Sequence, residues 1–93
     1  MAQKKKSMMV NKTPQDLYNK IFQWYGLQDY EIGTAIKNEK IIGSKGKKKT
    51  LTIAFRVAEG GTIVTIDMEQ SLKIGYELNS DANMLISFIS SLS

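Results

Sequence analysis

Lysine is the residue type with the clearest chemical potential in this sequence, because it gathers in two short clusters. The first cluster is residues 4–6, and the second is the stretch "SKGKKKT", which supplies Lys45, Lys47, Lys48 and Lys49. Clustered lysines bind phosphates without regard to base sequence, and salt weakens such binding. The single arginine, Arg56, leaves almost no bidentate recognition of guanine or phosphate. The second cluster is therefore either a non-specific nucleic-acid contact or a solvated turn between two strands.

Groups suited to catalysis or metal binding are scarce. Histidine and cysteine are both absent, which removes the commonest general base, thiolate chemistry and zinc sites built from Cys and His. Asp67 and Glu69 share one strand face, where carboxylates usually improve solubility. The glycines of "GSKG" and "EGG" lack the ending of a phosphate-binding loop, and no serine lies in a nucleophile-elbow pattern. We expect no enzymatic activity, no catalytic or metal-binding residue and no cofactor.

The charge of the chain is concentrated in the two lysine clusters. The net charge is +4, from 13 basic and 9 acidic residues. Seven of the basic residues belong to the clusters, so the remainder carries six basic and nine acidic residues, a net charge of −3. The composition, 42% hydrophobic and 24% charged over 93 residues, is typical of one globular domain. We expect a mobile basic tail over 1–6 and a single α+β domain over 7–93, in a soluble cytoplasmic protein without membrane contact.

The stretch "TPQDLYNKIFQWYG" carries the clearest helix pattern. Thr13 can accept a hydrogen bond as the N-cap, and Pro14 falls at the first helical position, where its missing N–H costs nothing. Asp16 favours the positive end of the helix dipole. The pattern predicts a helix over 14–25. Its apolar stripe comprises Leu17, Tyr18, Ile21, Phe22 and Tyr25.

Alternating apolar residues follow this helix. They predict strands over 30–36, 40–44, 50–57, 62–68 and 71–78, with an optional short edge strand over 7–10. A last amphipathic helix is expected from Asn79 or Ser80 to Leu92. The fold class is thus α+β, with two layers in the order helix, antiparallel meander of four to five strands, helix. Both helices are expected on one face of the sheet.

The sheet face opposite the helices is the second candidate site. Alternation assigns it small and weakly apolar residues, including Gly33, Ala35, Gly43, Ala54, Ile63 and Gly75. An ordinary solvated face would hold more Lys, Glu and Gln. This composition fits either an open sheet rich in Thr and Ala or a surface that packs against another chain or a ligand.

The whole layout resembles one repeat of the TATA-binding-protein-like fold. The opening "KTPQDLYNKI" also resembles the strand-then-helix start of helix-grip, START-like domains, and small bacterial domains share a similar arrangement. The resemblance extends over residues 13–92. It implies that both helices lie on one side of the sheet and that the other side is used for contact.

These observations favour a small non-enzymatic binding or interaction domain that associates with itself through the sheet face. The expected partner is a second copy, giving a dimer, or another protein. The alternative is weak, non-specific nucleic-acid binding through Lys45, Lys47, Lys48 and Lys49.

Overall fold

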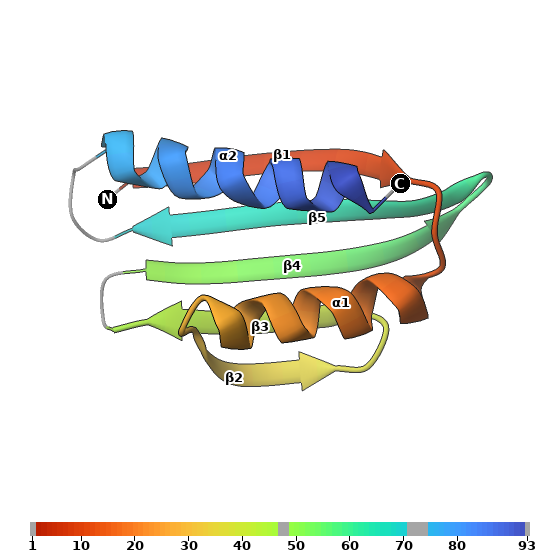
Figure 1. Cartoon of the computed structure of the whole chain (residues 1–93), viewed down its shortest axis with the longest axis horizontal. Coiled ribbons are helices and arrows are strands. Elements are labelled where there is room, and N and C mark those ends of the chain that lie inside the picture. The colour runs from red at the N-terminus through yellow and green to blue at the C-terminus, as the bar shows by residue number, and fades with distance from the viewer. Residues whose placement is uncertain (1, 47–48, 71–74, 93) are drawn as a thin grey trace.

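The computed structural model describes residues 2–46, 49–70 and 75–92 (Figure 1). Five strands and two helices follow one another along the chain. They are β1 (Ala2–Val10), α1 (Pro14–Leu27), β2 (Glu31–Ile36), β3 (Lys40–Lys45), β4 (Lys49–Ala58), β5 (Gly61–Gln70) and α2 (Gly75–Ser91). This order confirms the predicted α+β class and its helix–meander–helix arrangement.

The five strands form one antiparallel sheet in the order β1-β5-β4-β3-β2. Strands β2 to β5 are a meander, and β1 pairs with the last strand of that meander. In Figure 1 both helices lie in front of the sheet: α2 contacts β1 and β5, whereas α1 contacts β2, β3 and β4. The two helices therefore cover one face side by side, as predicted.

The start of α1 has the predicted cap. The Oγ1 of Thr13 accepts a hydrogen bond from the backbone N–H of Asp16 at 3.2 Å, and Pro14 opens the helix. The helix continues past Gly26 to Leu27, and Asp29 then adopts a positive φ of 62°. A short polar side chain tolerates this left-handed conformation, so Asp29, and not Gly26, takes the left-handed conformation at the end of the helix.

The core lies between the sheet and the two helices. Its sheet side is formed by fully buried residues on the three central strands, and α1 and α2 supply the other side. The buried members are Val10, Leu17, Ile21, Trp24, Tyr25, Tyr30, Ile41, Leu51, Ile53, Phe55, Val64, Ile66, Met68, Ala82, Leu85 and Ile89. The alternating pattern correctly predicted the buried face of β4 as far as Phe55, and that of β5 from Val64 onward.

Helix α1 is rotated about its axis relative to the predicted stripe. Trp24, which is not part of the predicted stripe, is only 6% exposed and stacks on Tyr30 and Phe88 at ring-centroid distances of 5.9 and 6.1 Å. Phe22, expected in the core, is 40% exposed. The large ring of Trp24 fills the space between the two helices, which favours this rotation because it buries more apolar area.

Residues 2–6 differ from the predicted mobile tail. They form the first half of β1 and are in register with β5 from Gln70 to Ile66. Lys4 and Lys6 therefore fall on the helix side of the sheet, and Lys5 falls on the opposite side. Residues 2–6 have the composition of a mobile tail, but backbone pairing with the long strand β5 makes them part of the sheet.

The predicted strand over 71–78 is also corrected. Residues 75–78 belong to the first turn of α2, and residues 71–74 lie outside the described part of the chain. The apolar spacing of 72, 74, 76 and 78 suggested a strand. The fifth strand of the sheet is instead β1, which occupies the edge beside β5.

Strand β2 contains a bulge between Ile32 and Thr34. The extra residue, Gly33, shifts the alternation of everything that follows it. Ile36, which simple alternation from Ile32 would place on the helix side, is in register with Lys40 on the opposite face and is 44% exposed. Val57, which continues the alternation of Ile53 and Phe55, is 73% exposed near the end of β4.

Candidate functional site

We define the open face as the sheet surface on the side away from α1 and α2. None of the described elements covers it. The strand registers place on it one residue in two from each strand, all at least partly exposed. They are Gln3, Lys5, Ser7 and Met9; Ile63, Thr65, Asp67 and Glu69; Thr50, Thr52, Ala54 and Arg56; Lys40, Ile42 and Ser44; and Glu31, Thr34 and Ile36.

A shallow hollow of about 570 Å³ lies on the open face over β1, β5 and β4. Its lining combines small side chains with two cations, Lys5 and Arg56. Its remaining lining is Ser7, Ala54, Phe55, Ile63 and Thr65. The hydroxyls of Ser7 and Thr65 are hydrogen-bonded to each other at 3.1 Å, so these two polar groups of the hollow already have a partner.

The carboxylate of Asp67 on this face is already engaged. Its Oδ1 accepts a hydrogen bond from the side-chain amide of Gln3 at 2.9 Å, and Lys5 is its direct cross-strand neighbour. Glu69, predicted to share its face, does so and lies opposite Gln3. The neutral Gln3 and the positive Lys5 are therefore the immediate neighbours of the Asp67 carboxylate. A carboxylate in such surroundings can improve solubility or take part in a contact.

Two of the six predicted interface residues, Ala54 and Ile63, lie in this hollow. Gly33 is exposed at the bulge of β2. Ala35 is in register with Ile41, whose side chain is fully buried on the helix side, so the assignment of Ala35 to the open face was wrong. The bulge is the reason, because it inverts the alternation beyond Gly33.

Gly43 and Gly75 are the other two corrections. Gly43 faces α1, where a Cβ atom would lie 2.5 Å from Cε2 of Tyr25. Gly75 is the first residue of α2 and belongs to no strand. The smallness of Gly43 thus makes room for an aromatic ring of the core, and has no role in contact with a partner.

The lysine turn joins β3 to β4. Lys45 and Lys49 are cross-strand neighbours, Gly46 has a positive φ of 63°, and Lys47 and Lys48 lie outside the described residues. The Nζ of Lys45 lies 5.3 Å from the ring centroid of Tyr30, a cation–π contact. This turn and the first residues of β1 lie at the same end of the sheet.

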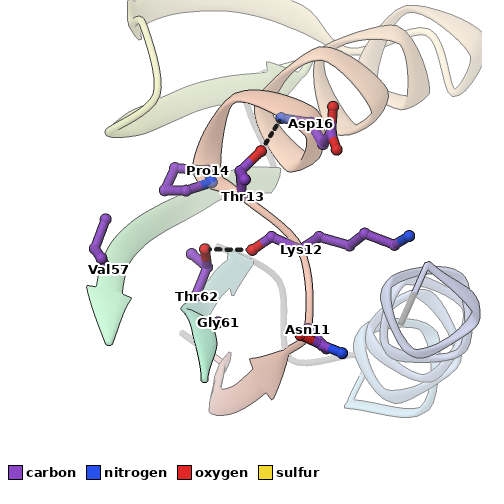
Figure 2. A pocket seen from close by; sticks show the side chains of 8 residues that line it. All are labelled: Asn11, Lys12, Thr13, Pro14, Asp16, Val57, Gly61 and Thr62. Carbon is purple, nitrogen blue, oxygen red and sulfur yellow. Dashed lines mark hydrogen bonds between the residues drawn. The ribbon is translucent and has the colours of Figure 1, made fainter. Parts of the chain in front are cut away.

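A second hollow, of about 390 Å³, lies where the loop before α1 crosses the β4–β5 hairpin (Figure 2). Its polar groups are largely used by the fold: the hydroxyl of Thr62 donates to the carbonyl of Lys12 at 2.7 Å, and Thr13 caps α1. Gly61 is required here, because a Cβ would collide with the carbonyl of Val10. The shape of this hollow therefore follows from the contacts that hold the loop before α1 against the β4–β5 hairpin.

A third hollow, of about 200 Å³, lies between the two helices and is largely apolar, with Trp24 and Phe88 in its wall and Leu27 79% exposed at its edge. Within the described residues, no group of three or more Asp, Glu, His or Cys side chains is arranged to hold a metal ion. Among the same residues, no helix has the length and apolar character needed to cross a membrane.

The fold and the open face define a two-layer α+β domain with one sheet face uncovered by its described elements. No protein-family model matches the sequence, and none of the curated proteins matches it significantly. Among solved structures, the Aha1 dimer from Colwellia psychrerythraea is similar in fold, with a TM-score of 0.74 over 99% of this chain and 96% of that chain. The sequences are 12% identical, so the similarity concerns the fold.

The residues that sequence reasoning missed on the open face include Lys40, Ile42 and Ile36, as well as Gln3, Lys5, Ser7 and Met9 of β1. The "KII" sequence at 40–42 gives no preference for either isoleucine as the buried one, since both are equally apolar. Only the pairing of Ile41 with Ile53 puts Ile41 inside and Ile42 outside. Arg56 was recognised as the single arginine, but its position beside the hollow follows from the structure.

Proposed function

We propose that this chain is a small non-enzymatic interaction domain that associates with a second copy of itself through the open face. The observation that carries the proposal is the hollow of the open face, whose lining includes Ala54 and Ile63. Small and apolar side chains on a sheet face let a second sheet approach to about 10 Å, the usual separation of packed sheets.

The surroundings of the hollow also support this function. Met9 and Ile36 are 51% and 44% exposed on the same face, and Ile63 and Ile42 are half-buried there. Burial of apolar side chains is the main favourable contribution to most associations. The similar Aha1 structure is a dimer according to its description, which fits an association of this kind.

The size of the open face sets the expected strength of the association. Five strands about 4.8 Å apart and roughly eight residues long present ~600 Å² on one copy. Two copies together would bury about 1,200 Å², the lower end of the range for stable protein interfaces. We therefore expect an interface near the lower size limit of stable complexes, and its dissociation on dilution has to be measured because area alone does not set affinity.

Light scattering at several protein concentrations tests this function. Ala54→Lys and Ile63→Lys each place a charge in the hollow of the open face, so each variant should remain folded and become monomeric. Gln15→Lys, on the exposed side of α1, adds the same charge away from the open face and should leave the dimer intact. A wild-type chain that is monomeric at several hundred micromolar would reject self-association.

Weak nucleic-acid binding is the second candidate function. The observation in its favour is that the lysine turn and the first residues of β1 lie at one end of the sheet. Replacing Lys45, Lys47, Lys48 and Lys49 with glutamine should then lower the affinity equally for all sequences. For duplex DNA the salt slope should flatten by about 0.9 for each phosphate that the variant no longer neutralises. Unchanged binding to duplex DNA in this variant would exclude the lysine turn.

A further inference from the structure

The third hollow belongs to the layer of helices and is separate from the open face. Figure 1 shows α1 and α2 side by side on one face of the sheet, and the hollow lies between them. From α1 it is lined by Lys20, Gln23, Trp24 and Leu27. These residues follow one another at spacings of three, one and three, so they share one side of the helix. Two apolar residues of α2 complete the described lining.

The wall of the third hollow is aromatic and firmly held. Trp24 is only 6% exposed, and its ring stacks on that of Phe88 with an interplanar angle of 25°. On α2, Leu92 follows Phe88 by one helical turn, and both are half-buried. Leu27 is 79% exposed at the edge of the hollow. The hollow is therefore an apolar surface that exists before any ligand arrives.

The volume of the hollow limits what it can hold. It measures about 200 Å³. An apolar cavity of about 150 Å³ accommodates a benzene molecule. A single aromatic ring with a short side chain therefore fits, and rings pair well with aromatic walls in stacked or edge-to-face arrangements. Water in the hollow finds few hydrogen-bonding partners along an apolar wall, so a ligand displaces it at little cost.

The polar part of the lining selects the charge of the ligand. Among the described residues that line the hollow, Lys20 is the one charged side chain, and Gln23 supplies an amide that can donate hydrogen bonds. Both residues are exposed, so a carboxylate beside them keeps much of its water. An exposed charge pair contributes little affinity. Lys20 therefore favours an acid over a neutral compound, while the apolar wall supplies most of the binding.

We propose that the third hollow binds a small aromatic monocarboxylate. The ring lies against Trp24, Leu27 and Phe88, and the carboxylate lies beside the ammonium group of Lys20. This site is independent of the open face, so it adds a ligand to the function proposed above and does not require self-association.

Phenylacetate is a suitable test ligand, because it joins one benzene ring to one carboxylate. Trp24 is the single tryptophan of the chain, so its fluorescence reports directly on the hollow. A ligand of this size should bind with a dissociation constant on the order of 1 mM. Phenethyl alcohol carries the same ring without the charge and should bind about two- to fivefold more weakly. High salt should reduce this difference, because it screens the attraction to Lys20.

Two variants test the two parts of the site. Leu27→Asn removes an exposed apolar contact without disturbing the core, and it should weaken both compounds about threefold or more. Lys20→Gln should abolish the preference for phenylacetate and change the affinity for phenethyl alcohol less than about twofold. Met84→Asn, an exposed apolar position of α2 outside the lining, and Lys37→Gln, in the β2–β3 turn, are the matched controls and should bind as wild type.

The possible outcomes each decide a part of the proposal. The absence of a saturable change in Trp24 fluorescence with either compound overturns the site. Binding that Leu27→Asn leaves unchanged overturns its location, and a preference for phenylacetate that persists in Lys20→Gln overturns the contact with the carboxylate. Ala54→Lys should bind phenylacetate as wild type does, whatever its effect on self-association, and a loss of binding in this variant would contradict the independence of the two sites. Circular dichroism establishes that each variant is folded.

Discussion

Gly43 shows how one missing side chain positions a helix on the sheet. The ring of Tyr25 lies where a Cβ of residue 43 would be, with Cε2 and Cδ2 at 2.5 and 2.6 Å from that position. Both residues are buried, and the ring cannot move without displacing α1. Glycine at this position therefore determines how closely α1 approaches β3.

Gly43→Ala should destabilise the protein by about 1–3 kcal/mol, because the added methyl group overpacks a rigid aromatic contact. Urea denaturation measures the loss. Gly33→Ala is the matched control, since the nearest atom to its added Cβ is the carbonyl oxygen of Ile42 at 4.0 Å. Its effect should stay within about 0.5 kcal/mol. Equal stabilities of the two variants would contradict this packing.

The hydroxyl of Tyr25 is a polar group buried in the core. It lies 3.1 Å from the carbonyl of Ile41 and 2.9 Å from that of Leu51, so its single proton serves two acceptors on neighbouring strands. Burial, and secondarily the charge of an ionised Tyr30, raise the pKa of Tyr25 far above its ordinary value of 10.0. The folded protein therefore excludes the ionised form.

Tyr25→Phe should cost about 1–3 kcal/mol at neutral pH, because the two carbonyls lose their donor. A pH effect is also expected. Above pH 10 the unfolded tyrosine loses its proton and the folded one keeps it, so the wild-type stability falls with rising pH, by about 1.4 kcal/mol per unit from this group. Urea denaturation at pH 9, 10 and 11 should show a shallower fall for Tyr25→Phe. Parallel curves would show that the hydroxyl is accessible to water.

At the scale of the elements, the start of α1 depends on a local contact. Thr13 satisfies the backbone N–H of Asp16 at a helix end where four such donors lack partners in the helix. Thr13→Ala should lower the free energy of unfolding by about 0.5–2 kcal/mol. Gln15→Ala, an exposed position in the first turn of the same helix, should change it by less than about 0.5 kcal/mol. An unaffected Thr13→Ala variant would mean that water replaces the cap.

Strand β1 provides a test of the edge of the sheet. Residues 2–6 are in register with β5, so their paired amides should exchange with solvent at least about tenfold more slowly than those of an unstructured peptide. Hydrogen exchange followed by NMR measures this directly. The amide of Gly60, at the tip of the β4–β5 hairpin, supplies the fast reference. Exchange of residues 2–6 at the peptide rate would restore the interpretation as a mobile tail.

At the scale of the whole molecule, self-association should link stability to concentration. A partner that binds only the folded chain stabilises it, by about 2.7 kcal/mol at a hundredfold excess over the dissociation constant. The Tm of the wild-type protein should therefore rise by several degrees when the protein concentration is raised roughly a hundredfold, for example from about 5 to about 500 μM. Ala54→Lys should show a Tm independent of concentration, and Gln15→Lys should follow the wild type. A constant wild-type Tm would contradict the dimer.

Features set by neighbouring residues could be read from the sequence. The Thr13–Pro14 start of α1 is one, since cap and first turn are in direct contact along the chain. The buried faces of β4 and β5 were also predictable, because Leu51, Ile53 and Phe55 alternate with polar or small residues, and alternation is a property of a single strand.

Of the candidate site, the sequence by itself determined that a strand face carrying Ala54 and Ile63 is small and weakly charged. It did not determine which residues of β2 and β3 join that face. This depends on the bulge at Gly33 and on the pairing of Ile41 with Ile53, contacts between segments that are separate in the sequence. Alternation of side chains is a local property of one strand. Which of the two strand faces is buried under the helices depends on strand pairing, because the pairing that buries the larger apolar area is the more stable one. That pairing is decided by the tertiary structure.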